Sequence, residues 1–201
     1  IHTLDGHREA LDYLWECKQR GIIRAVGASM HHIAAVEGAI QRGLEVIHPL
    51  LNREGLGIVD GSRTQMEGAL RRAHDAGIGI YSMKPLGGGN LFQSAPECLD
   101  YALGLDFVDS VAIGMQSVEE VDANLYFWSH GRFSDADANR LRQKERRLHI
   151  DFWCEGCGEC SRVCGQKALS LQDGKEVCDH KRCILCGYCA PACPYWAIKV
   201  V

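Results

Sequence analysis

The chain has 201 residues, of which 46% are hydrophobic, and a formal net charge of −4. This composition predicts a soluble globular protein with ample core in one or two domains. It excludes a membrane span, because no apolar run reaches ~18 residues, and nucleic acid is not an expected partner, because the only dense basic stretch, residues 140–147, contains an acidic residue.

Residues 1–133 alternate short apolar runs with amphipathic segments. Short apolar runs between helices are typical of buried parallel strands. Glycines at 21, 43 and 77 stand where helices commonly end. The region therefore predicts an α/β fold with four strand–helix units after an opening helix at 6–19. The expected strands are 22–28, 44–50, 78–83 and 108–115, and the expected helices are 31–42, 64–76, 96–105 and 118–129.

Three segments of this region resemble successive strand ends of the aldo/keto reductase family. They are G-I-I-R-A-V-G-A-S at 21–29, G-I-G-I-Y-S-M-K-P-L-G-G-G at 77–89 and V-A-I-G-M-Q-S-V-E-E-V-D-A-N at 111–124. The resemblance covers about residues 1–130 and implies the C-terminal half of that family's (β/α)8 TIM barrel. Since a full barrel takes ~250 residues, we interpret the chain as a fragment of a longer protein. The family's catalytic Asp, Tyr, Lys and His lie on the missing strands, so the resemblance implies no catalytic residue here.

The resemblance also implies a nicotinamide-cofactor site, because barrels of this kind bind ligands at the C-terminal ends of their strands. Ser29 matches the family's carboxamide-binding serine, and His48 stands in place of its carboxamide-binding glutamine. An imidazole can both donate and accept a hydrogen bond, so His48 can replace the amide. The alternative for His48 is a histidine that only packs at a strand end.

The phosphate side of this NAD(P)H site is expected at two later segments. A glycine-rich loop at 84–89 offers backbone N–H groups to a pyrophosphate, and the helix that begins at 118 offers its dipole and free amides. Glu120 stands where relatives that use NADPH carry a cation, which favours NADH. In the alternative interpretation, Glu120 and Asn124 only cap and solvate the helix. The implied positions are Lys84, Leu86, Gly87, Gly114, Met115, Gln116, Ser117, Glu120 and Asn124.

Residues 134–150 predict a charged linker helix, after which the composition changes. Nine of the eleven cysteines fall in the last 48 residues, and eight of them form two copies of C-x2-C-x2-C-x3-C, 29 residues apart. Three thiolates at this spacing can wrap one corner of a [4Fe–4S] cluster, while the fourth reaches the neighbouring cluster. We therefore expect one cluster on Cys154, Cys157, Cys160 and Cys193, and the other on Cys183, Cys186, Cys189 and Cys164.

Two other uses of these cysteines are open alternatives. Eight cysteines can form four disulfides in a secreted mini-domain, or two zinc sites. Zinc sites normally pair two separated C-x2-C hooks, which leaves two cysteines of each copy without a role. Cys178 lies outside both copies, and we interpret it as a small buried hydrophobe.

The repeat extends beyond the cysteines, since A-L-S-L at 168–171 aligns with A-I-K-V at 197–200. We expect a pseudo-twofold α+β domain in which a turn at Asp173-Gly174 closes a hairpin between 169–171 and 176–178. Residues 151–201 resemble the bacterial two-cluster ferredoxins, which transfer single electrons at low potential. In that family proline usually follows the fourth cysteine; Pro194 agrees, whereas Gly165 follows Cys164.

These parts together predict an iron–sulfur oxidoreductase. Its reductase-like barrel at 1–133 is joined through a linker helix at 134–150 to a two-cluster domain at 151–201. Thiolate clusters need a reducing compartment, so we expect the cytoplasm. Electrons would pass to a redox partner protein or a small carbonyl substrate. The alternative is a non-catalytic electron-transfer module with a degenerate barrel, because hydride transfer moves two electrons, each cluster moves one, and no flavin motif is visible.

Overall fold

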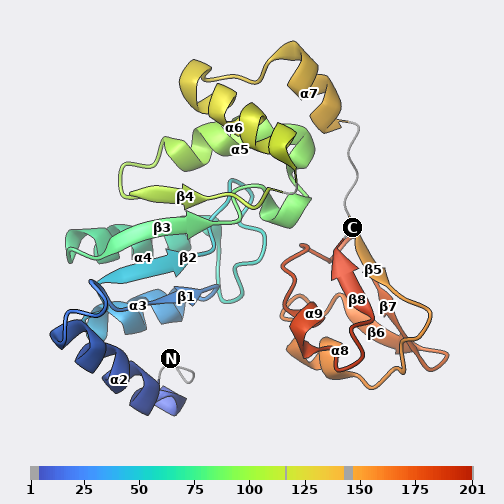
Figure 1. Cartoon of the computed structure of the whole chain (residues 1–201), viewed down its shortest axis with the longest axis horizontal. Coiled ribbons are helices and arrows are strands. Elements are labelled where there is room, and N and C mark those ends of the chain that lie inside the picture. The colour runs from blue at the N-terminus through green and yellow to red at the C-terminus, as the bar shows by residue number, and fades with distance from the viewer. Residues whose placement is uncertain (1–4, 116, 143–146, 201) are drawn as a thin grey trace. The chain divides into compact units, whose positions relative to one another are not determined.

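The computed structural model describes residues 5–115, 117–142 and 147–200 (Figure 1). The chain divides into two compact units. The first comprises Ile1–Pro85 and Leu99–Gly114, and the second comprises Leu86–Cys98 and Met115–Val201. Among the described residues, none of the helices has both the length and the apolar character needed to cross a membrane.

The first unit is built on an open sheet of four parallel strands in the order β1-β2-β3-β4. The expected alternation of strands and helices is confirmed, with ends that shift by a few residues. The elements of this part of the chain are α2 Arg8–Gln19, β1 Gly27–Met30, α3 Ile33–Gln41, β2 Val46–Pro49, α4 Arg63–Asp75, β3 Gly79–Met83, α5 Ala95–Leu103 and β4 Ser110–Ala112.

The first strand starts later than the sequence predicts, at Gly27 instead of residue 22. The backbone N–H of Val26 donates to the Glu45 carboxylate at 3.1 Å, so a side chain takes the place of a strand partner there. At Gly27 the neighbouring strand comes very close, because a Cβ added there would lie 2.0 Å from the Val46 carbonyl oxygen. Only glycine allows this approach.

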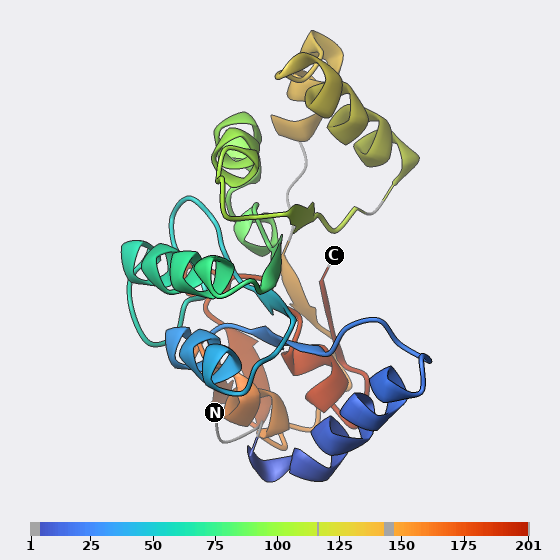
Figure 2. The ribbon, with the colours of Figure 1, turned by 90° about the vertical axis from the view of Figure 1, so that its left-hand side faces the viewer.

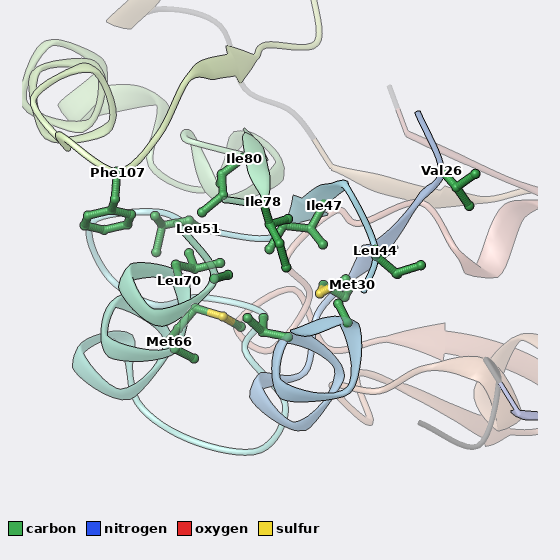
Figure 3. Close-up of a cluster of buried hydrophobic side chains, with 14 residues drawn as sticks. Val26, Met30, Leu44, Ile47, Leu51, Met66, Leu70, Ile78, Ile80 and Phe107 are labelled. Carbon is green, nitrogen blue, oxygen red and sulfur yellow. The ribbon is translucent and has the colours of Figure 1, made fainter. Parts of the chain in front are cut away.

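The core of the first unit lies between the sheet and the helices α3 and α4, which lie next to each other (Figures 1 and 2). Met30, Ile47 and Ile80 point from the strands into a cluster with Met66 and Leu70 of α4 (Figure 3). Successive strand residues point to opposite faces. The residues beside this apolar set, such as Ser29 and His48, therefore lie on the other face of the sheet.

The second unit contains two small antiparallel sheets and several short helices. β6 pairs with β7 and β5 pairs with β8, and α8 packs against α9. The elements are η1 Gly87–Gly89, η2 Phe92–Ser94, α6 Val118–His130, α7 Asp135–Arg142, β5 Leu148–Ile150, α8 Glu159–Val163, β6 Leu169–Gln172, β7 Lys175–Cys178, α9 Cys189–Ala192 and β8 Ile198–Val200.

The predicted hairpin is confirmed. Asp173 and Gly174 connect β6 to β7 with φ values of 49° and 75°. Two successive positive φ angles are typical of the type I′ turn, whose twist matches that of the strands it joins. The Asp173-Gly174 pair is therefore the local signal that fixes this hairpin.

The predicted linker helix at 134–150 is wrong in its last part. Helix α7 ends at Arg142, and residues 143–146 lie outside the described part of the chain. Residues 148–150 form β5, which pairs with β8 from Leu148 opposite Val200 to Ile150 opposite Ile198. Pairing with a strand 50 residues later in the chain overrides the local helical pattern.

Candidate functional site

All eleven cysteines of the chain are free thiols, so the alternative of four disulfides is wrong. Among the residues that the structure describes, no group of three or more His, Cys, Asp or Glu side chains is placed to hold a metal ion. A zinc ion needs its donors around one point, whereas the ligands of a [4Fe–4S] cluster bind separate irons of a cube. For a cluster, the relevant test is therefore whether four thiols line the same cavity.

One small cavity, of about 20 Å³, is lined by Cys164, Cys183, Cys186 and Cys189. Three of these cysteines belong to the second copy of the repeat, and Cys164 belongs to the first. Apolar residues, among them Leu148, Leu169 and Ile184, complete the lining. The structure thus brings together the four thiols that the spacing assigns to one cluster, and this donor set fits such a group.

The other quartet is brought together in part. Cys154, Cys160 and Cys193 are buried in one hydrophobic cluster that also contains Cys189, whereas Cys157 is exposed. Burial raises the pKa of the Cys160 thiol to about 12, and it raises that of Cys189 to about 11. Neutral thiols at these positions must release protons when iron binds.

Backbone N–H groups approach three of the cysteine sulfurs. The N–H of Ala168 donates to Cys164 Sγ at 3.3 Å, and the N–H of Ala197 donates to Cys193 Sγ at 3.3 Å. Both bonds join a cysteine to the residue four positions later, as the pseudo-twofold repeat requires. Gly156 donates in the same way to Cys154 Sγ at 3.4 Å. Such bonds tune the potential of a bound cluster.

Sequence reasoning missed two charged residues of β7 that contact the first quartet's segment. The Lys175 ammonium donates to the carbonyl oxygen of Cys154 at 2.7 Å. The next residue, Glu176, is buried and accepts a hydrogen bond from the hydroxyl of Ser161, beside Cys160. Both side chains reach across from the hairpin, so no local spacing pattern signals them.

In the first unit, the face of the sheet opposite the helices carries Ser29 and His48 side by side, since the two residues are aligned in the β1–β2 register. The His48 ring stacks on Tyr81 of β3, with ring centroids 4.1 Å apart. His48 Nδ1 also lies 2.5 Å from the carbonyl oxygen of Tyr81. Sequence reasoning missed Tyr81, although its alternation with the buried Ile80 is a signal for this face.

The glycine-rich loop after β3 uses part of its hydrogen-bonding capacity internally. Lys84 has a φ of 58°, and Gly87 lies in the 3-10 turn η1, for which Leu86 is the N-cap. The N–H groups of Gly89 and Leu91 both donate to the carbonyl oxygen of Leu86. These two amides are therefore occupied, and fewer remain for a phosphate than the bare loop suggests.

The remaining predicted positions lie around the start of α6. Gly114 and Met115 precede it, and Ser117 is its N-cap, whose hydroxyl accepts from the N–H of Glu120 at 3.4 Å. The Glu120 side chain is buried, and Asn124 is half-buried one turn later. Gln116 lies outside the described residues.

Comparison with known proteins gives a match for each of two segments of the chain. Residues 2–97 match the aldo/keto reductase family, and residues 153–197 match the 4Fe-4S dicluster domain. The chain is therefore similar to the aldo/keto reductase family in its first half and to 4Fe-4S dicluster domains near its end. The reductase match includes Ser29, His48 and the glycine-rich loop but stops before the start of α6. It therefore covers less than the expected residues 1–130.

Two curated relatives each match about a quarter of the chain. An uncharacterized ferredoxin of Methanocaldococcus jannaschii is 43% identical over 53 residues, which is 25% of this chain and 35% of the relative. NADH-quinone oxidoreductase subunit I 2 of Geobacter metallireducens is 35% identical over 62 residues, 26% of this chain and 47% of the relative. The chain thus spans less than half the length of either protein. No solved structure gives a significant match.

Two glycines of the dicluster domain allow a matched test of its packing. Gly156 and Gly158 both have positive φ, 61° and 78°. A Cβ at Gly156 would lie 2.3 Å from the carbonyl oxygen of Gly174, whereas a Cβ at Gly158 meets nothing within 4 Å. We expect Gly158→Ala to cost ~1–2 kcal/mol of stability from backbone strain alone. Gly156→Ala should cost a further ~1–3 kcal/mol, because the hairpin turn must move.

Anaerobic urea unfolding of the two variants measures this difference, and iron content shows whether the first quartet still assembles. Equal losses for the two alanines would show that the contact with Gly174 does not constrain the loop.

In the reductase segment, the buried His31 gives a pH-dependent contribution to stability. Burial, followed by the positive charges of Lys84, His32 and His48, lowers the pKa of His31 to about 4. In the unfolded chain its pKa returns to ~6.5. The native state therefore disfavours the charged form. The contribution of His31 to the free energy of unfolding is complete above pH ~6.5, and it falls by roughly 3 kcal/mol as the pH drops to about 4.

We therefore expect His31→Gln to flatten the fall in unfolding free energy between these two pH values. Urea unfolding of both proteins at pH 7 and pH 4.5 measures the slopes. Parallel slopes would show that His31 is not the titrating group.

Proposed function

We propose that this chain is the electron-carrying part of a longer iron–sulfur oxidoreductase and that it binds two [4Fe–4S] clusters. One cluster would use Cys154, Cys157, Cys160 and Cys193, and the other Cys164, Cys183, Cys186 and Cys189. The observation that carries the proposal is the cavity lined by Cys164 together with three cysteines of the second copy. A shared lining of this kind supports an exchange of the fourth ligand between the two halves.

When bound, each cluster would accept and release one electron at a time. The chain's own groups set the conditions for this transfer. Buried thiols and apolar neighbours keep water away from the cavity, while the N–H groups of Ala168 and Ala197 donate to cysteine sulfurs from equivalent places in the two halves. Such bonds stabilise negative charge on the sulfurs and so favour the reduced state.

We further propose that residues 1–133 form the C-terminal half of a TIM barrel and that residues 134–150 connect it to the cluster domain. Four parallel strands in chain order support a barrel segment, and the match over residues 2–97 supports the family. The catalytic residues would lie in the part of the barrel that precedes this segment, and the longer protein would be cytoplasmic. Its electrons would go to a redox partner protein or to a small carbonyl compound.

The nicotinamide site is the second part of this proposal. Ser29 and His48 would hold the carboxamide, with Tyr81 beside them as a ring for the nicotinamide to stack on. Lys84, Leu86, Gly87 and the start of α6, including Gly114 to Ser117, would take the phosphates. The carboxylate of Glu120 favours NADH over NADPH, because a 2′-phosphate would meet a negative charge.

One observation favours a second candidate, a non-catalytic electron-transfer module. The His48 ring stacks on a face of the Tyr81 ring. A nicotinamide ring that stacks on this face must displace the His48 ring. Titration of the complete protein with NADH, followed by tryptophan fluorescence, separates the candidates. Saturable binding, tighter for NADH than for NADPH, supports the oxidoreductase, and no binding supports the module.

The first experiment is anaerobic analysis of the purified chain for iron, acid-labile sulfide and visible absorption. We expect about eight irons and eight sulfides per chain, and a broad band near ~400 nm that dithionite bleaches. Two zinc ions and no sulfide would overturn the proposal for both clusters.

A further inference from the structure

A fifth thiol lies beside the second cysteine quartet. Cys178 is the last residue of β7, where it pairs with Leu169, and Leu169 lines the cavity of the second quartet. After Cys178 the chain turns back at once. The carbonyl oxygen of Asp179 accepts from the N–H groups of Arg182 and Cys183, at 3.1 and 3.0 Å. One helical turn therefore returns Cys183 to the end of the strand that carries Cys178.

Several other thiols share the buried cluster on which Cys178 packs. Together with Cys164 and Cys183 it packs against the buried cluster that contains Cys189. Cys164, Cys178 and Cys183 therefore lie around one buried cluster of side chains.

The pseudo-twofold repeat shows that the fold does not require a thiol at this place. Leu169 and Ile198 are equivalent, because they are 29 residues apart in the two copies. Leu169 pairs with Cys178, whereas Ile198 pairs with Ile150. The first half thus has an isoleucine where the second has a cysteine. A merely apolar role is satisfied by the isoleucine, so the thiol in the second half needs a separate reason.

Cys178 also lines a second cavity, of about 310 Å³, together with His149, Glu176 and His180. Its side chain is only partly buried, so packed neighbours do not enclose it on every side.

We propose that Cys178 is an alternative ligand for the iron otherwise bound by Cys183. This inference rests on the proposed second cluster. In the exchange, the Fe–S bond to Cys183 breaks and an Fe–S bond to Cys178 forms, while the proton of the Cys178 thiol passes to the released Cys183 thiolate. No electron is transferred and no other reactant is needed. The second cluster would therefore tolerate the loss of Cys183, whereas the first has no spare thiol.

Iron and sulfide analysis of anaerobically prepared variants tests this inference. We expect Cys183→Ala to keep close to eight irons per chain, and Cys178→Ile/Cys183→Ala to lose about half of them. The isoleucine copies the first half of the domain, so the double variant removes the thiol and keeps the packing. Cys17→Ala/Cys183→Ala, which removes a thiol from α2 instead, should keep its iron like the single variant.

The first half of the domain supplies an internal comparison. Cys154 occupies the position equivalent to Cys183, and Ile150 occupies the strand position that corresponds to Cys178. Cys154→Ala alone should therefore lose about half of the iron. Equal iron loss in Cys183→Ala and in the Cys178→Ile/Cys183→Ala double variant would overturn the inference.

A second readout identifies the iron ligands directly. Alkylation with iodoacetamide followed by mass spectrometry reports which thiols are free of iron. Cys178 should be alkylated more slowly in Cys183→Ala than in the unmutated protein, and equal rates in the two proteins would overturn the inference. If the unmutated protein itself holds far fewer than eight irons, the proposed function fails, and this outcome is distinct from a failure of the ligand exchange alone.

Discussion

Cys193→Ala is expected to remove one whole cluster, which is about four of about eight irons. Although Cys193 belongs to the second copy of the repeat, the cluster lost should be the one that the first copy holds. Cys193 is buried together with Cys154 and Cys160, which belong to the first copy. The helices that contain the third cysteine of each copy, α8 and α9, pack against each other. The fourth cysteine of each copy therefore stands at the boundary between the two halves.

The double variant Cys154→Ala/Cys193→Ala distinguishes crossed from uncrossed ligands. If the two cysteines share one cluster, the double variant keeps about four irons, as either single variant does. If Cys193 serves its own copy, the double variant loses a ligand from each cluster and its iron falls toward zero. Iron analysis with electron paramagnetic resonance of the reduced proteins measures the outcome, and Cys17→Ala controls for the loss of a cysteine outside both copies.

Ile47→Ala is expected to destabilise the first unit by roughly 2–5 kcal/mol. Ile47 is completely buried in the middle of β2, in the cluster that joins the sheet to α3 and α4. Its truncation removes apolar contacts and leaves a cavity that a packed interior fills only in part. Urea unfolding followed by far-ultraviolet circular dichroism measures the loss.

The neighbouring residue supplies the matched control. His48 points to the opposite face of the same strand, where it is half-buried and stacks on Tyr81. His48→Ala should therefore cost much less, on the order of 1 kcal/mol for a ring pair. Equal costs for the two alanines would contradict the assignment of the apolar core to one face of the sheet.

The features that sequence predicts well are those with local causes. The strand–helix alternation of the first unit follows from short apolar runs and helix-ending glycines. The hairpin follows from Asp173-Gly174, whose residue types suit positive φ angles. The spacing of the cysteines within each copy likewise needs no knowledge of the distant chain. Each of these patterns depends on neighbours within a few residues.

The features that sequence missed depend on distant partners. Residues 148–150 look like the end of a charged helix, but they become a strand because β8 pairs with them. The stacking of His48 on Tyr81 joins two strands separated by a helix. Cys178 lies next to Cys183 only because the hairpin and the turn at Asp179 return the chain. Local periodicity carries no information about such contacts.

The sheet of the first unit has two edge strands, each of which pairs on one side only among the described residues. β1 has its sole partner in β2, and β4 has its sole partner in β3. The outer row of backbone N–H and C=O groups on such a strand is a template for another chain. β4 is only three residues long, which limits its use as a template, while β1 is four residues long and begins with a glycine. When this chain is produced on its own, self-association should therefore begin along β1. A charged residue in place of the exposed Ser29 is the simplest way to reduce aggregation in concentrated samples.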